Sequence, residues 1–207
     1  MLGYSHFQAA NLLWRLQHGE LPHNLYPKVW WLSIGSNDLA SGGCSEEATV
    51  LGVMRIAEEL AAATPDAEVV IQGILPRSSR SDGSLDSRGF GHHIFARPHS
   101  QKYKANQAKS HYLLWPSIQH INSELEKFCQ KQDHMIYFDA SSLFVGSMGN
   151  AHFQSQTQYI VSELMPDYTH LSLKGYQVLG DRVESELRRI IYYEDDRNDV
   201  EEAAHFL

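Results

Sequence analysis

Asp167 and His170 are the residues of this 207-residue chain whose types and spacing most directly suggest catalysis. An aspartate three residues before a histidine, on a turn that ends before a helix, can accept the imidazole Nδ1 proton and leave Nε2 free as a base. The motif is short, and on its own it more often marks an aspartate that caps a turn beside a surface histidine. Its meaning therefore depends on the other groups that the fold brings to it.

Asn37 and Gly3 are the candidates for the complementary role of stabilising negative charge. Asn37 lies in the segment Gly-Ser-Asn-Asp at 35–38, directly after an apolar run. At that position its side-chain amide can donate to a developing oxyanion, and the backbone N–H of Gly3 can supply a second donor. An isolated asparagine in such a segment more often bonds locally in a turn.

The elements that must position these residues alternate between strands and helices. Continuous apolar runs, typical of parallel strands covered on both faces, occur at 29–34, 69–75 and 135–138. Apolar residues at helical spacing predict helices over 7–18, 45–63, 116–131 and 172–190, and Ser45 and Ser172 are placed to cap two of them. This order predicts an α/β fold, in which the functional loops leave the carboxyl ends of parallel strands.

We expect residues 1–191 to form one domain. The stretch around 77–115 is rich in polar residues and glycine and has no hydrophobic period, so it is interpreted as an insertion. Residues 139–170 are predicted to be irregular. The acidic tail at 192–207 is expected to be flexible.

The formal charge of −8 and a pI near 5.8 argue against nucleic-acid or anionic-membrane partners, which would repel this surface. No apolar run approaches the roughly 18 residues that a membrane span requires. The protein is therefore expected to be soluble, and cytoplasmic if Met1 is its true start. Its oligomeric state is open, and a homo-oligomer is compatible with the sequence.

The chain offers no pattern typical of a metal or cofactor site. Twelve histidines are present, but none forms HExxH or a Cys/His quartet, and His92 and His93 lie among polar loop residues. Cys44 and Cys129 are expected to be free thiols. We predict no metal and no cofactor, and interpret Trp30 and Trp31 as core residues of the first strand.

Several segments in consistent order resemble the SGNH hydrolases, also called GDSL esterases, and within them the catalytic subunits of platelet-activating-factor acetylhydrolases. The segments that carry the resemblance are 13–21, 27–29, 35–38, 73–77 and 164–176. The resemblance covers most of residues 1–191. It implies a three-layer α/β/α, flavodoxin-like fold with a parallel sheet.

The resemblance also implies hydrolysis of a small-molecule ester by a Ser-His-Asp mechanism without a cofactor. Carried over position by position, it assigns the base to His170, the acid to Asp167, and the oxyanion hole to Gly3 and Asn37. The family's nucleophile lies in a Gly-Asp-Ser segment upstream of the glycine that aligns with Gly3. This chain begins two residues before that glycine, so no residue aligns with the nucleophile.

None of three other serines is favoured as the nucleophile. Ser84 lies in a polar loop after a different strand, Ser5 aligns where relatives usually have glycine, and Ser36 has no defined orientation. The resemblance further implies that the first strand and most of the second are missing from the strand order 2-1-3-4-5. Strands 3-4-5 would remain, with the run 29–34 as an exposed apolar edge, which favours a truncated sequence.

Two functions follow from these observations. The first is an ester hydrolase in its complete form, with the chain as given inactive because its nucleophile is absent. The second is a catalytically dead pseudoenzyme or a partner-binding subunit of the same fold.

Overall fold

The computed structural model describes residues 8–22, 24–85, 114–150 and 155–205. Gly3, Ser5, His92 and His93 lie outside the described residues. The elements are, in chain order, α1 (Ala9–Arg15), the π-helical turn η1 (Leu16–Glu20), β1 (Val29–Leu32), α2 (Ser36–Ala40), α3 (Glu46–Ala63), β2 (Glu68–Gln72), α4 (Leu114–Cys129), β3 (Met135–Phe138), the 3₁₀ turn η2 (Ser141–Phe144), β4 (Val145–Asn150), β5 (Ser155–Ile160) and α5 (Leu173–His205).

The three predicted strands form one parallel sheet in the order β1-β2-β3. Trp30 pairs with Val69, and Val69 pairs with Met135. This confirms the predicted α/β class. In the part of the chain that the structure describes, β1 lies at an edge of the sheet, as the sequence predicted.

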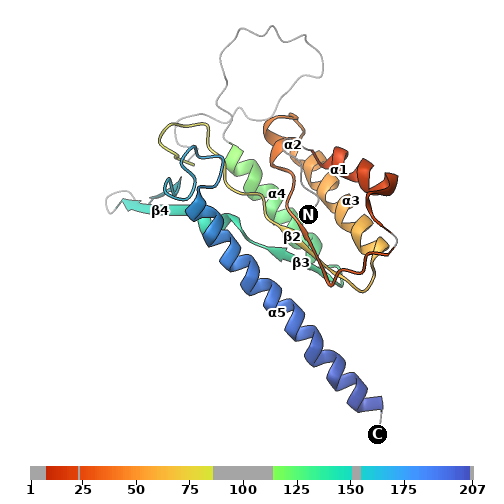
Figure 1. Cartoon of the computed structure of the whole chain (residues 1–207). Helices are drawn as coiled ribbons and strands as arrows, with labels where there is room; N and C mark the ends of the chain where they lie inside the picture. The colour runs from red at the N-terminus through yellow and green to blue at the C-terminus, as the bar shows by residue number, and fades with distance from the viewer. Residues whose placement is uncertain (1–7, 23, 86–113, 151–154, 206–207) are drawn as a thin grey trace.

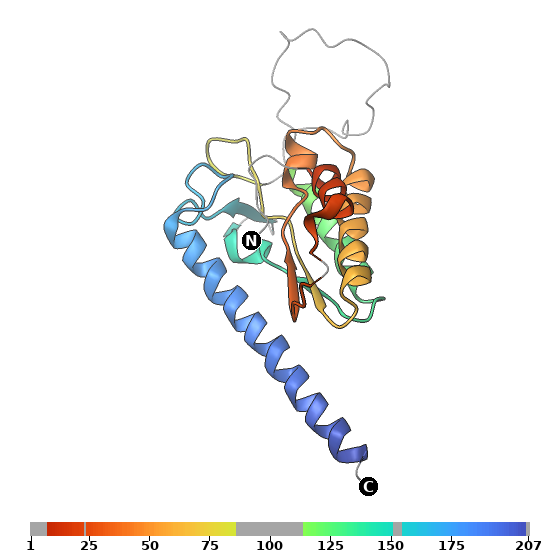
Figure 2. The same ribbon diagram turned by 45° about the vertical axis from the view of Figure 1, so that its right-hand side comes forward.

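Helices cover both faces of the sheet, which gives three layers (Figure 1). Trp30, Val69 and Met135 belong to the larger core on the side of α1, α3 and α4, whereas Trp31, Val70 and Ile136 belong to the smaller core on the side of α5. Figure 2 shows the same separation from a second direction. The alternation of side chains along each strand explains why the apolar runs are continuous: both faces are covered.

The two tryptophans of β1 pack as predicted, each with a polar partner for its indole N–H. Trp30 donates to Thr64 Oγ1 at 2.7 Å, and Trp31 donates to Gln72 Oε1 at 3.0 Å. The Trp31 ring also meets Phe138 edge-on, with 4.9 Å between the ring centroids. Both side chains are therefore held in the sheet although β1 is an edge strand.

Both predicted helix caps are confirmed. Ser45 Oγ accepts the backbone N–H of Ala48 at 3.2 Å, and Ser172 Oγ accepts that of Gly175 at 3.0 Å. Each bond satisfies one of the amide groups that a helix leaves unpaired in its first turn.

The last helix is longer than the sequence pattern predicted. We expected it to end near Ile190, but α5 continues through the acidic segment 192–205 to His205. The flexibility expected of this tail stays a prediction. The segment contains neither glycine nor proline, so nothing in it stops a helix. None of the described helices is long and apolar enough to cross a membrane.

The stretch predicted to be irregular contains a β-hairpin. β4 and β5 pair antiparallel, from Val145 opposite Ile160 to Asn150 opposite Ser155. The loop after β2 joins the hairpin, because Leu85 donates to the Gln158 carbonyl and Ile160 donates to the Gly83 carbonyl, both at 2.9 Å. The hairpin escaped prediction because its strands are polar and glycine-containing, so their period gives no signal.

Candidate active site

Asp167 and His170 form a hydrogen-bonded pair on the turn before α5. His170 Nδ1 lies 2.6 Å from Asp167 Oδ2. The other carboxylate oxygen, Oδ1, accepts the backbone N–H groups of Thr169 and His170 at 2.9 and 2.7 Å. The carboxylate therefore shapes the turn with one oxygen and orients the imidazole with the other. Asp167 can cap the turn and hold His170 at the same time.

The turn that carries this pair is held by the protein core and by the loop after β2. Leu164 and Met165 are buried, and the Leu164 carbonyl accepts the backbone N–H of Ser172 at 2.8 Å. On the other side, Ser78 N–H donates to the Tyr168 carbonyl at 3.0 Å. The Tyr168 ring lies so close to Gly83 that a Cβ added there would meet it at 2.4 Å. The loop after β2 therefore fixes the position of the turn.

The pair faces solvent, since 79% of the His170 side chain and 55% of the Asp167 side chain are accessible. The imidazole Nε2 is therefore reachable by an incoming molecule. The His170 side chain, followed by the His170 backbone N–H, holds the pKa of Asp167 at about 2, below its ordinary value. The carboxylate is thus ionised at neutral pH, as orientation of a histidine base requires.

This pKa can be tested directly. We expect the Asp167 carboxyl to titrate near pH 2 in a carbon-detected NMR experiment and its pKa to rise in His170→Ala, because the largest stabilising contact of the carboxylate is lost. A carboxyl pKa lowered by folding stabilises the folded chain above its unfolded pKa of about 3.9, and this contribution disappears as the pH falls toward 2. An unchanged pKa in His170→Ala would contradict the assigned contact.

Asn37 lies on α2, which begins directly after the carboxyl end of β1. The preceding Gly35 has a φ of +110°, and a Cβ there would meet Ile74 Cδ1 at 2.8 Å. The ends of β1 and β2 are therefore packed together. Within the described residues no hydrogen bond involves the Asn37 side chain, which is half-buried, while its carbonyl accepts the N–H groups of Ser41 and Gly42. Its amide is available for a ligand.

The structure brings Asp167 and His170 into contact and places Asn37 at the same edge of the sheet. The loop that leaves β2 connects them, because it touches Gly35 through Ile74 and carries Ser78, which bonds the Tyr168 carbonyl. No hydrogen bond joins Asn37 to Asp167 or His170 among the described residues. The proposed role of Gly3 stays a prediction.

Asp38 is a residue of this region that sequence reasoning missed. Its side chain is buried, and both carboxylate oxygens accept the backbone N–H of Ala9, at 2.9 and 3.1 Å. The carboxylate thereby fixes the start of α1 against α2, where negative charge is favourable at a helix N-terminus. The available signal was a charged residue placed between two apolar elements, where burial requires a partner.

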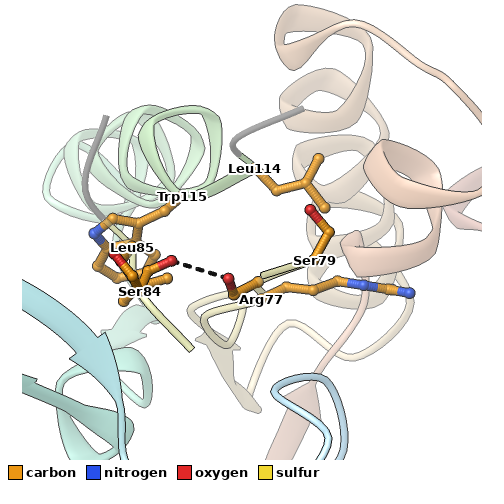
Figure 3. A pocket seen from close by; sticks show the side chains of 7 residues that line it. Arg77, Ser79, Ser84, Leu85, Leu114 and Trp115 are labelled. Carbon is orange, nitrogen blue, oxygen red and sulfur yellow. Dashed lines mark hydrogen bonds between the residues drawn. The ribbon is translucent and has the colours of Figure 1, made fainter. Parts of the chain in front are cut away.

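None of the described serines hydrogen-bonds His170; among these residues the imidazole contacts Asp167. Ser36 lies on α2, and Ser84 bridges to Tyr159. Figure 3 shows Ser84 beside Leu85 and Trp115, with its carbonyl accepting Ser78 Oγ at 2.9 Å. The gap that these residues line is too narrow for a water molecule. The absence of a nucleophile from this chain stays a prediction. The described part of the chain holds no cluster of metal-ligating side chains.

The fold and this site define an α/β domain with a parallel sheet and an Asp-His pair on the turn before its last helix. A family model described as GDSL-like Lipase/Acylhydrolase matches residues 8–183. The chain belongs to this family. A search of curated protein sequences found no match.

Solved structures share the fold at low sequence identity. A carbohydrate esterase family 3 protein from Talaromyces cellulolyticus is 17% identical, with a TM-score of 0.59, over 92% of this chain and 70% of that one. A GDSL-like lipase from Bacteroides thetaiotaomicron is 17% identical, with a TM-score of 0.60, over 89% and 73%. A protein described as a platelet activating factor from Streptococcus pneumonia is 18% identical, with a TM-score of 0.58, over 88% and 69%.

Proposed function

We propose that this chain supplies the acid-base half of an ester hydrolase that cleaves acyl esters of small, uncharged molecules. The observation that carries the proposal is the 2.6 Å contact between Asp167 Oδ2 and His170 Nδ1, which leaves Nε2 exposed. Membership of the GDSL-like lipase/acylhydrolase family supports the reaction class. The net charge of −8 disfavours anionic substrates.

In the proposed mechanism His170 Nε2 takes the proton of a serine hydroxyl as the oxygen attacks the acyl carbonyl. Asp167 keeps the imidazole in the required tautomer and stabilises the imidazolium that forms. The Asn37 amide and the Gly3 backbone N–H donate to the tetrahedral oxyanion. His170 then returns the proton to the departing alkoxide, and water repeats the cycle on the acyl-serine. None of these steps calls for a metal or an organic cofactor.

The nucleophile is proposed to lie on a strand outside these 207 residues that would pair with β1. The support is the unpaired edge of β1 among the described residues and the lack of a Gly-Asp-Ser segment in the sequence. The second candidate function is a pseudoenzyme or partner-binding subunit. It is favoured by one observation, that no described serine contacts His170.

The sequence encoded upstream of Met1 and an esterase assay separate the two functions. We expect an in-frame strand ending in Gly-Asp-Ser upstream, and turnover of p-nitrophenyl acetate by the protein that includes it. The 207-residue chain alone should give no turnover above the uncatalysed rate. An upstream sequence without such a strand, together with inactivity, supports the pseudoenzyme. Turnover by the 207-residue chain that depends on His170 overturns the claim that its nucleophile is absent.

Replacing Asn37 with alanine tests the oxyanion role in the serine-containing protein. We expect kcat to fall roughly 10²- to 10³-fold with little change in KM, because the donor acts mainly on the transition state. Asn24→Ala is the matched control, since Asn24 is exposed and precedes the amino end of β1, whereas Asn37 follows its carboxyl end. A loss confined to KM, or equal losses in both variants, would contradict the role.

A further inference from the structure

A concave region that neither Asp167 nor His170 lines lies between α4, the end of β3 and the β4–β5 hairpin. It has a volume of about 630 Å³ and is open to solvent. This volume is in the range of small-molecule sites, which is roughly 300 to 1,000 Å³. We call it the α4–hairpin groove; among its lining residues are Gln119, Ser123, Glu126, Asp139, Ser147 and Gln158.

The lining of the groove is polar and carries negative charge. Glu126 and Asp139 are its two carboxylates, and no lysine, arginine or histidine is found among the described residues that line it. Burial, followed by the charges of Asp139 and Glu126, raises the pKa of the neighbouring Tyr137. The charges that the described residues place around the groove are therefore negative, which disfavours a phosphate, a carboxylate or an acidic sugar.

Three side chains that line the groove are held in place by hydrogen bonds to other parts of the protein or to neighbouring residues. Asn122 bonds both backbone groups of Ile74, at 2.8 and 3.0 Å. Gln158 Oε1 accepts the Trp115 indole N–H at 2.8 Å, and Asp139 Oδ1 accepts the Ser141 hydroxyl at 2.6 Å. These bonds hold α4, the hairpin and the β3 end in place, so the groove is largely preformed.

Other polar groups of the groove make no side-chain hydrogen bond to the described residues. Within the part of the chain that the structure describes, no side-chain hydrogen bond involves Gln119, Ser123, Glu126 or Ser147, and none involves Asp139 Oδ2. Together they offer an amide, two hydroxyls and carboxylate oxygens around one space. A ligand with several neutral hydroxyl groups can donate to the carboxylates and exchange hydrogen bonds with the amide and the serines.

An organic cation would also be attracted by the two carboxylates, but the described lining offers an ammonium group little aromatic surface. Trp115 is only 7% exposed with its N–H bonded to Gln158, and the other aromatic side chain of the lining, Tyr137, is partly buried. We propose that the α4–hairpin groove is a binding site for a neutral carbohydrate. This site does not depend on the proposed esterase activity, because none of the catalytic candidates lines it.

Titration of the 207-residue protein with neutral tetrasaccharides tests the proposal. The probes are xylotetraose, mannotetraose, cellotetraose and chitotetraose, followed by amide NMR shifts and calorimetry at millimolar concentrations. We expect at least one to bind and to shift the amides of α4 and the hairpin. Tetragalacturonate and tetramethylammonium, which carry opposite charges, are expected to bind at least tenfold more weakly than that tetrasaccharide.

Variants locate the binding. Ser123→Trp fills the groove and should abolish it, whereas Ser185→Trp on the exposed surface of α5 should not. Gln119→Ala should weaken the affinity for the tetrasaccharide about threefold to tenfold, because hydrogen bonds are lost. The control Gln177→Ala, on α5, should leave this affinity unchanged. Glu126→Gln should leave neutral-sugar binding within threefold, because the amide still accepts a hydroxyl.

Three outcomes overturn the proposal. The first is that none of the four tetrasaccharides binds. The second is that Gln119→Ala and Ser123→Trp both leave binding unchanged. The third is that tetramethylammonium binds more tightly than the tetrasaccharides and that Glu126→Gln removes this binding. If Ser123→Trp fails to fold, the Gln119→Ala and Gln177→Ala pair still decides the location. The catalytic proposal is tested by turnover alone, so failure of either proposal leaves the other standing.

Discussion

His170→Ala is expected to lower kcat/KM for p-nitrophenyl acetate by roughly 10⁴-fold or more in the serine-containing form of the protein. The imidazole is the group proposed to move the proton in both half-reactions, and its Nδ1 is already bound to Asp167 at 2.6 Å. Because the side chain is 79% accessible, its removal leaves no cavity and should not unfold the domain. The effect is therefore expected in the rate and not in stability.

The control for this variant is His120→Ala, which removes an exposed imidazole from α4. Turnover should be unchanged there, and both variants should unfold at the same urea concentration as the parent. Retention of more than a tenth of the activity in His170→Ala would exclude His170 as the base. The serine-containing protein would then need another proton acceptor.

Asp167→Asn is expected to reduce kcat roughly 10³- to 10⁴-fold. An asparagine can keep the backbone bonds through its oxygen, so the turn should persist, but its NH₂ group would then face Nδ1. That contact favours protonation of Nε2, which is the nitrogen that must accept the serine proton. The charge that would stabilise the imidazolium is lost as well.

The tautomer can be read from ¹⁵N shifts of the His170 ring. We expect them to show Nδ1 protonated in the parent and Nε2 protonated in Asp167→Asn. Asp133→Asn, at an exposed position before β3, is the matched control and should change neither the shifts nor kcat. If the tautomer changes while kcat does not, Asp167 shapes the turn without a role in proton transfer.

Much of the fold was predictable because its signals are local. The strand at 135–138 was predicted with the bounds that the structure gives, and both serine caps act where they were expected. The position of Asn37 after an apolar run also predicted that it lies at the carboxyl edge of the sheet. The hairpin of β4 and β5 was missed because its strands are polar and contain glycine, so they show no hydrophobic alternation. The reach of α5 to His205 was missed because composition was weighted above the lack of a helix stop.

The sequence by itself determined the class of the fold and singled out Asp167 and His170 as a candidate pair, because periodicity, capping and a three-residue spacing are properties of neighbouring residues. Only the tertiary structure decided that Asp167 both shapes the turn and holds the imidazole, since this requires the direction of each carboxylate oxygen. It also decided that Asp38 anchors α1 and that α4 and the hairpin enclose a polar groove. These features join segments far apart in the chain, and no local pattern encodes the distance between them.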